Sequence, residues 1–177
     1  MAIEISRAQN RSDLEQILSL QKQNLPNALS QIEKEKEGFL TVTHTLDLLV
    51  RMNNVCPHII AKDGNKLVGY ALCMHPKFGD EIAILKPMIN EINTILPQDE
   101  SFIIMGQVCI HKAYRKAGIF RKLYKKMQET VGSINTNIVT EVDASNTRSL
   151  IAHLAVGFQE LKIYNASGRK WHLIAMK

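Results

Sequence analysis

Apolar residues alternate with polar ones, or form short continuous runs, in seven parts of the chain, and both patterns are typical of β-strands. The turn Asp63-Gly64-Asn65 joins the second and third of these strands into a hairpin. The predicted strands lie at residues 3–7, 57–62, 66–74, 102–110 and 137–143, with two more that end at Met176.

Helical spacing of apolar residues appears between the strands. Ser12-Asp13-Leu14-Glu15 has the form of a capping box and predicts the start of a helix that ends before Pro26. A charged run at residues 31–38 reads as a solvated helix face or a loop. The apolar segment 39–52 then predicts a further helix.

Residues 75–100 form a segment that is longer than a hairpin needs and rich in apolar side chains. An extra helix packed on the core, a substrate lid and a contact in a homodimer all remain open for it. The order of strands and helices predicts a mixed α/β sheet in one domain, residues 1–177, with residues 75–100 as an insertion.

Composition agrees with this fold, because 177 residues with 45% hydrophobic side chains suffice for one compact core. The longest clearly apolar run, residues 68–74, is far too short to cross a bilayer, and no secretory signal opens the chain. We therefore expect a cytoplasmic protein with no membrane partner. Cys56, Cys73 and Cys109 lack CxxC spacing, and no histidines have metal-ligand spacing, so we expect buried thiols and no metal.

The segment from Gln107 to Lys126 leads from an apolar strand, through a basic loop, into an amphipathic helix. The first backbone N–H groups of a helix lack intrahelical partners and attract anions. Gly118 lets a ligand approach the main chain closely, and Arg115 and Lys116 add positive charge beside those amides. This loop would suit a diphosphate.

The loop residues Arg115-Lys116-Ala117-Gly118-Ile119-Phe120 resemble the acyl-CoA loop of the GCN5-related N-acetyltransferase (GNAT) superfamily. Its usual form is Gln/Arg-x-x-Gly-x-Gly/Ala, so Arg115 and Gly118 match, while Phe120 stands where the family prefers a small residue. A second motif of the family follows in the correct order, with His153 in place of its tyrosine. The matching positions are Asn146, Ser149, Gly157 and Phe158.

The resemblance covers residues 3–176 and implies an α/β, GNAT-like fold. Its mixed, mainly antiparallel central sheet would be splayed in the middle and flanked by helices. Acetyl-CoA, the implied co-substrate, would lie in the gap, with its pantetheine along the strand edge and its diphosphate on the loop amides. Asn146 would reach the pantetheine, cap its helix, or do both. The implied binding residues are Val108, Cys109, Ile110, Arg115, Lys116, Ala117, Gly118, Ile119, Phe120 and Asn146.

The implied activity is an acyl-CoA-dependent N-acyltransferase that transfers acetyl to a primary amine of a small molecule or peptide by direct attack. Ile104 stands where several members of the family carry a glutamate base. The base therefore remains open between Glu141, Asp143, His111 and an ordered water relay. His153 is the predicted catalytic acid, because an imidazole can donate a proton near pH 7. A histidine packed at the edge of an apolar face is the alternative.

Two other functions remain open. A non-catalytic acyl-CoA-binding sensor or interaction module of the same fold would fit the missing glutamate and tyrosine. The net charge of +5 and the basic residues Arg121, Lys122, Lys125 and Lys126 invite a nucleic-acid hypothesis. It is the weaker interpretation, because those residues form the solvated face of an amphipathic helix.

Overall fold

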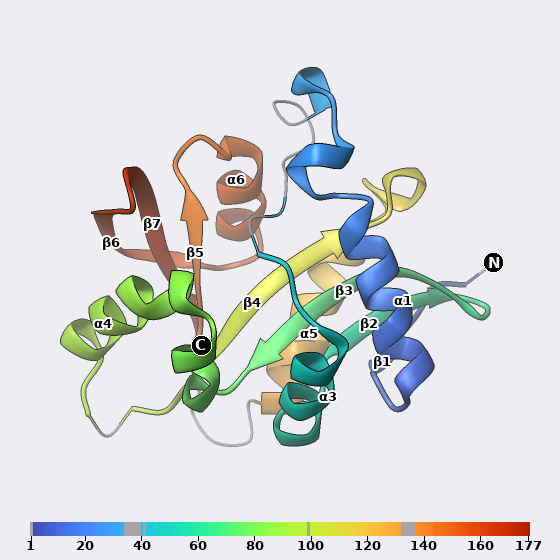
Figure 1. Cartoon of the computed structure of the whole chain (residues 1–177), viewed down its shortest axis with the longest axis horizontal. Coiled ribbons are helices and arrows are strands. Elements are labelled where there is room, and N and C mark those ends of the chain that lie inside the picture. The colour runs from blue at the N-terminus through green and yellow to red at the C-terminus, as the bar shows by residue number, and fades with distance from the viewer. Residues whose placement is uncertain (1, 34–39, 41, 99, 132–136) are drawn as a thin grey trace.

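A seven-stranded sheet forms the centre of the protein (Figure 1). The structure is a computed structural model that describes residues 2–33, 40, 42–98, 100–131 and 137–177. Its strands are β1 (Glu4–Arg7), β2 (Ile59–Asp63), β3 (Lys66–Met74), β4 (Phe102–Ile110), β5 (Asn137–Asp143), β6 (Gln159–Ala166) and β7 (Arg169–Met176). Its helices are α1 (Arg11–Lys22), α3 (Leu46–Val55), α4 (Lys86–Ile95), α5 (Ile119–Val131) and α6 (Thr147–Ala155). Short 3₁₀ helices lie at Pro26–Ala28, Pro76–Glu81, Ala83–Leu85 and Lys112–Tyr114.

The sheet opens in its middle. The strand order is β1-β2-β3-β4-β5-β7-β6, and every neighbouring pair is antiparallel except β4 and β5. That parallel pair is in register only from Phe102–Ile104 to Asn137–Val139, after which the two strands separate. On its other side, β4 carries an extra residue, Gly106, between its pairings with Leu72 and Cys73. The predicted splayed, mainly antiparallel α/β fold is confirmed.

Helices cover both faces of the sheet. The apolar sides of α5 and α6 pack on one face, where Leu123 and Met127 are fully buried. α1, α3 and α4 cover the other face, with Ile17, Leu49 and Ile92 in contact with the strands. β3 is buried along almost its whole length because it is covered from both sides, which explains its continuous apolar sequence.

The predicted hairpin, the strands at 102–110 and 137–143, and the helix that begins after Asn146 are confirmed. The start of the first helix was predicted wrongly. Its cap is Asn10, whose side chain accepts a hydrogen bond from Asp13 N at 3.0 Å, while Asp13 accepts one from Gln9 N at 2.9 Å. Ser12 therefore lies inside the first turn. Most of the charged run at 31–38 lies outside the described residues.

The segment 75–100 contains two 3₁₀ helices and α4, and it packs on the core through Phe78, Leu85 and Met88. Gly79 allows a close approach, since a Cβ there would lie 2.0 Å from Cδ1 of Ile89. The segment therefore packs on the core as an additional helix, which is one of the three alternatives left open for it. Its status as an insertion in a single domain, and a role in a homodimer, stay predictions.

The three cysteines are free and buried, as predicted. Within the described residues, no helix has the length and apolar character needed to cross a bilayer. The cytoplasmic location stays a prediction.

Candidate functional site

The basic loop turns sharply between β4 and α5. Lys116 and Gly118 have φ angles of 64° and 73°, in the left-handed region that favours glycine. A Cβ on Gly118 would meet nothing within 4 Å, so the glycine is needed for its backbone conformation. This turn places residues 115–118 directly before the first N–H groups of α5.

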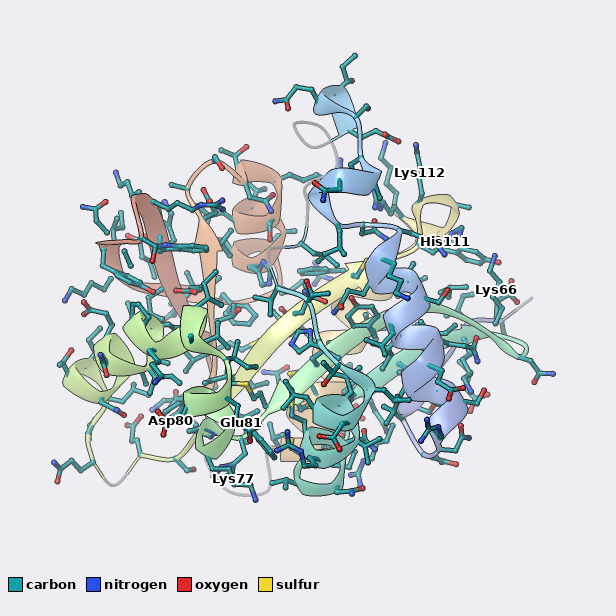
Figure 2. The ribbon with its side chains drawn as sticks, in the orientation of Figure 1. Lys66, Lys77, Asp80, Glu81, His111 and Lys112 are labelled. Carbon is teal, nitrogen blue, oxygen red and sulfur yellow. The ribbon has the colours of Figure 1, made fainter. Side chains whose placement is uncertain are left out.

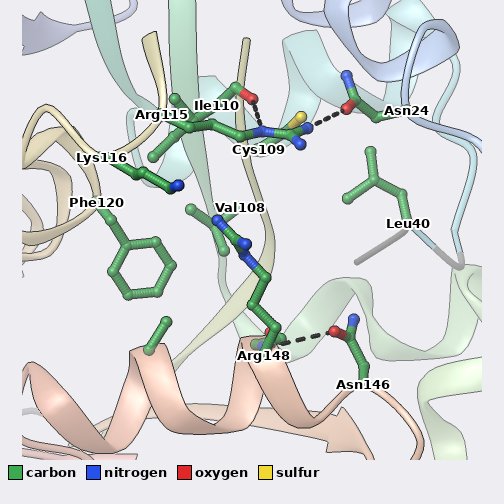
Figure 3. A pocket seen from close by; sticks show the side chains of 12 residues that line it. Asn24, Leu40, Val108, Cys109, Ile110, Arg115, Lys116, Phe120, Asn146 and Arg148 are labelled. Carbon is green, nitrogen blue, oxygen red and sulfur yellow. Dashed lines mark hydrogen bonds between the residues drawn. The ribbon is translucent and has the colours of Figure 1, made fainter. Parts of the chain in front are cut away.

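A cavity of about 200 Å³ lies between this loop and the start of α6; we call it the loop cavity (Figure 3). Seven of the predicted acetyl-CoA residues line it, and Asn24, Leu40, Arg148, Ser149 and Ala152 complete its lining. Ala117, Gly118 and Ile119 do not line it, and Ile119 is a core residue with 1% exposure. The seven are Val108, Cys109, Ile110, Arg115, Lys116, Phe120 and Asn146. Their roles as ligands stay predictions.

Arg115 is held in place across the end of β4. Its Nε donates to the carbonyl oxygen of Ile110 at 3.1 Å, and one terminal nitrogen donates to Oδ1 of Asn24 at 2.9 Å. Both contacts are visible in Figure 3. A guanidinium fixed in this way keeps its charge at the cavity without losing side-chain freedom when a ligand binds.

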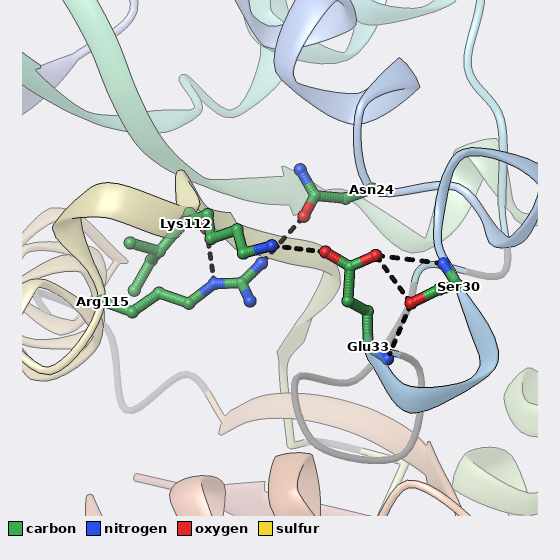
Figure 4. A network of polar contacts seen from close by, with 6 residues as sticks. Asn24, Ser30, Glu33, Lys112 and Arg115 are labelled. Atoms are coloured by element: carbon green, nitrogen blue, oxygen red, sulfur yellow. Dashed lines mark hydrogen bonds and ion pairs between the residues drawn. The ribbon is translucent and has the colours of Figure 1, made fainter.

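A second link joins the same two parts of the chain (Figure 4). Lys112 forms an ion pair with Glu33, whose other carboxylate oxygen accepts hydrogen bonds from the N–H and hydroxyl of Ser30 at 3.1 and 2.9 Å. The hydrogen bond from Lys112 is the main reason that the pKa of Glu33 falls to about 2. The segment from Asn24 to Glu33 is therefore fixed beside the loop.

Sequence reasoning missed Arg148, in the first turn of α6. Its guanidinium points across the loop cavity toward the side of Arg115 and Lys116 (Figure 3). The sequence could have indicated this residue, because Arg148 follows the predicted binding residue Asn146 by only two positions. Asn146 itself caps α6, because its Oδ1 accepts a hydrogen bond from Ser149 N at 3.3 Å. Capping leaves its side-chain amide nitrogen for a second partner.

A second cavity lies in the gap between β4 and β5, and we call it the gap cavity. It shares Leu40, Val108, Asn146 and Ser149 with the loop cavity, so the two adjoin. Thr140 of β5 donates a hydrogen bond to the carbonyl oxygen of Met105 at 2.9 Å, next to the Gly106 bulge. A ligand extended along the edge of β4 would pass from one cavity into the other.

Glu141 contributes a carboxyl group to the gap cavity. Burial raises its pKa to about 7, against the opposing effect of a hydrogen bond from the hydroxyl of Tyr164. A carboxyl with a pKa near neutrality is suited to accept a proton at physiological pH.

The other two side chains left open as bases are less suitable. Although burial acts to raise it, the pKa of Asp143 is lowered by hydrogen bonds from Ser145 and by Arg169, its salt-bridge partner at 3.1 Å. His111 lies at the loop, where burial and the charges of Lys66 and Arg115 lower its pKa. Of the three, Glu141 combines the position and the pKa that a base requires.

His153 lines the gap cavity but is 1% exposed, and both of its ring nitrogens are occupied within the protein. Nδ1 lies 2.7 Å from the carbonyl oxygen of Ser149, and Nε2 lies 2.6 Å from the hydroxyl of Tyr124. Burial lowers its pKa to about 4. The neutral ring therefore donates from Nδ1 and accepts at Nε2. Its catalytic role stays a prediction.

No group of three histidine, cysteine or acidic side chains that could hold a metal occurs in the part of the chain that the structure describes.

The model of the acetyltransferase (GNAT) family matches this chain over residues 14–158. No curated protein matches the chain in sequence.

Solved structures share the fold at low sequence identity. The ribosomal-protein-S18-alanine N-acetyltransferase of Escherichia coli has a TM-score of 0.64 at 12% identity, covering 99% of this chain and 93% of its own. The yncA protein of Salmonella typhimurium with its cofactor acetyl-CoA scores 0.67 at 13% identity, covering 100% and 94%. Arabidopsis thaliana Naa50 in complex with the bisubstrate analogue CoA-Ac-MVNAL scores 0.65 at 13% identity, covering 100% and 99%.

Proposed function

Because the chain belongs to the GNAT family of acetyltransferases, we propose that it transfers the acetyl group of acetyl-CoA to a primary amine. One observation carries this proposal. The loop cavity, with its cations Arg115, Lys116 and Arg148, adjoins the gap cavity that contains Glu141. The loop cavity is thus suited to bind an anionic acetyl donor, and the neighbouring gap cavity contains a proton acceptor.

The residues of the loop cavity fit acetyl-CoA. The diphosphate lies against the loop amides and the cations, where backbone N–H groups and guanidinium groups pair with its oxygens. The pantetheine arm is an extended chain with amide groups, and it pairs with the free edge of β4 from Val108 to Ile110. The thioester then lies at the gap between β4 and β5.

Glu141 removes the proton from the incoming amine. An ordinary amine with a pKa of about 10.4 costs roughly 4.6 kcal/mol to deprotonate at pH 7, so a base matters for the rate. The neutral nitrogen attacks the thioester carbonyl, an N–C bond forms, the C–S bond breaks, and the nitrogen loses its second proton to water. A thiol with a pKa of about 8.5 leaves as the thiolate without a proton donor. This mechanism does not require His153.

The acceptor is a primary amine of a small molecule or a peptide. The N-acetyltransferase of a ribosomal-protein alanine and the Naa50 complex with a peptide-containing bisubstrate analogue support an amine acceptor for this fold. The alternative of a non-catalytic acyl-CoA-binding module is disfavoured by Glu141, since it places a carboxyl with a raised pKa at the gap, as acid–base catalysis requires.

Two measurements on the purified chain test this proposal. In a thermal-shift titration, acetyl-CoA at 100 times its Kd should raise Tm by roughly 5 to 10 °C, and duplex DNA should not. Thiol release from acetyl-CoA should then rise above background with at least one member of an amine panel. Binding without release would favour the module, and absence of binding would contradict the proposal.

A further inference from the structure

A third cavity opens on the far side of Glu141 from the loop, and we call it the acceptor pocket. Glu141 and Trp171 belong to both this pocket and the gap cavity, so the two adjoin at the carboxyl group. Most of the side chains that line it beyond Glu141 are apolar, among them Val42, Ile84, Leu85 and Met88. Among the described residues that line it, Glu141 is the one with a charged side chain.

Three of those wall residues come from the segment 75–100. Leu85 and Met88 are buried at its base, while Ile84 lies at the rim with 44% exposure. Ion pairs attach the segment to the rest of the fold at two points. Arg51 of α3 pairs with both carboxylate oxygens of Glu81 at 2.7 and 2.6 Å, and Lys162 of β6 pairs with Glu91 of α4 at 2.6 Å. Figure 2 shows Lys77, Asp80 and Glu81 of this segment, remote from His111 and Lys112 at the loop.

The opposite wall is fixed by a buried polar network. The side chain of Gln107 accepts hydrogen bonds from Gln21 at 2.8 Å and from the hydroxyl of Tyr70 at 2.7 Å. It donates to the carbonyl oxygen of Val42 at 2.8 Å. Val42 is therefore held against β4 beside the pocket, so both walls are formed before an acceptor arrives.

We propose that the acceptor pocket binds an apolar side group carried next to the reacting amine. The proposal rests on the proposed function and names its acceptor class, primary amines with an uncharged apolar substituent. The ammonium group of the acceptor pairs with Glu141, and the substituent packs on Ile84, Leu85 and Met88. An acidic substituent is rejected, because it would lose water of hydration among these apolar side chains and would be repelled by the carboxylate of Glu141.

This assignment gives the segment 75–100 a role as the wall that selects the acceptor. Such a wall discriminates through burial of apolar surface, where one methylene changes kcat/KM by about tenfold or more. Leucine or methionine derivatives should therefore be acetylated at least tenfold more efficiently than glycine derivatives.

The test uses the full chain, acetyl-CoA and a series of amino-acid amides whose α-amines are free: glycine, leucine, methionine, lysine and aspartate. Thiol release gives kcat/KM for each. The Ile84→Glu variant places a carboxylate at an exposed rim position, where the fold tolerates it. We expect it to lower kcat/KM for leucinamide at least tenfold and to raise it for lysinamide, whose second cation gains a partner.

Ile151→Glu is the matched control, since Ile151 is 67% exposed on α6 and lines none of the three cavities. It should leave the preference unchanged. Equal use of leucinamide and aspartamide by the unmodified chain, or an unchanged preference in Ile84→Glu, would overturn the assignment. Acetylation of other amines but of none of these amides would also overturn it, whereas failure to bind acetyl-CoA, or binding without thiol release with any amine, contradicts the proposed function instead. A tetrapeptide that begins with leucine is tested in the same assay. A higher kcat/KM than for leucinamide would indicate that the natural acceptor is a peptide N-terminus, and a lower one that it is a small amine.

Discussion

The loop cavity and the acceptor pocket lie at the two ends of one series of adjoining spaces, and they are built in opposite ways. The loop cavity carries three cationic side chains, Arg115, Lys116 and Arg148, and most of its lining comes from two short stretches, residues 108–120 and 146–152. The acceptor pocket has one carboxyl among mostly apolar side chains, and its lining comes from residues between 42 and 171 that only the tertiary fold brings together.

The difference reflects what each end binds. A diphosphate is recognised by main-chain amides and charge, which a strand, a turn and a helix supply locally. A particular side group is recognised by shape and apolar contact, which require packing between distant segments. Substitutions at the loop should therefore change donor binding alone, and substitutions at the pocket should change acceptor use alone.

The largest effect should follow Glu141→Gln. Loss of the base should lower kcat/KM by about 10² to 10⁴, while the Kd for acetyl-CoA changes less than twofold. In the unmodified chain, kcat/KM should rise with pH through about 7, because Glu141 must lose its proton to act as a base. A variant that keeps this pH dependence would assign the base to another group.

Stability provides the control for that variant. The pKa of Glu141 lies above its ordinary value of 4.5, so between those two values the folded chain binds more protons than the unfolded chain. The contribution of Glu141 to the free energy of unfolding therefore falls as the pH rises from about 4.5 to 7. Glu141→Gln removes this cost and should raise Tm at pH 8, which shows that lost activity is not lost folding.

At the other end, Gly118→Glu should weaken acetyl-CoA binding by about a hundredfold. It forces a side chain into a left-handed conformation and adds a negative charge beside the diphosphate. Calorimetric titration with acetyl-CoA measures the loss. Gly64→Glu is the matched control, since Gly64 also has a positive φ, 57°, with open space around it, but lies in the β2–β3 turn. Unchanged affinity in Gly118→Glu would contradict the loop assignment.

Arg148→Ala should have a smaller effect, about tenfold in the Kd for acetyl-CoA, because it removes one charge-assisted contact of several. The loss should shrink at high salt and vanish with pantetheine derivatives that lack phosphate. Arg121→Ala removes the same charge from α5 outside the loop cavity and should leave the Kd within twofold. If the two substitutions changed the Kd equally, Arg148 would act only through the net charge of the protein and not through a contact with the ligand.

The smallest effect on turnover is expected for His153→Phe, since both ring nitrogens of His153 are occupied within the protein. The pH profile of kcat from pH 6 to 9 should be unchanged. Stability should fall by about 1–3 kcal/mol, because the buried hydroxyl of Tyr124 loses its acceptor. Denaturant unfolding measures that loss. A fall in kcat confined to one side of the pH range would instead support the catalytic role predicted from the sequence.

The donor end could be predicted from the sequence because its residues are close together along the chain. The apolar strand, Gly118 and Asn146 each carried a local signal, and the helix and strands around them were placed correctly. The helix start at Asn10 was missed because both Asn10 and Ser12 are good caps. The contacts of Asp13 select Asn10 as the cap. Its N–H donates to the side chain of Asn10, and its carboxylate pairs with Lys62 of β2 at 2.5 Å.

The acceptor end could not be predicted, because its signals arise only on folding. Glu141 differs from Asp143 in the surroundings that set its pKa, and no sequence pattern shows that Tyr164 lies beside the first while Arg169 pairs with the second. The segment 75–100 shows helical spacing, yet only the packed structure places Ile84 and Met88 near Glu141.

The short register between β4 and β5 has a consequence for the lifetime of the protein. Three residue pairs join the β1–β4 half of the sheet to the half formed by β5, β6 and β7, so the main chain alone couples the halves weakly. A donor substrate lying along β4 would act as a missing strand and brace that junction. Because a ligand stabilises only the folded form, proteolytic survival of this protein should follow the supply of acetyl-CoA.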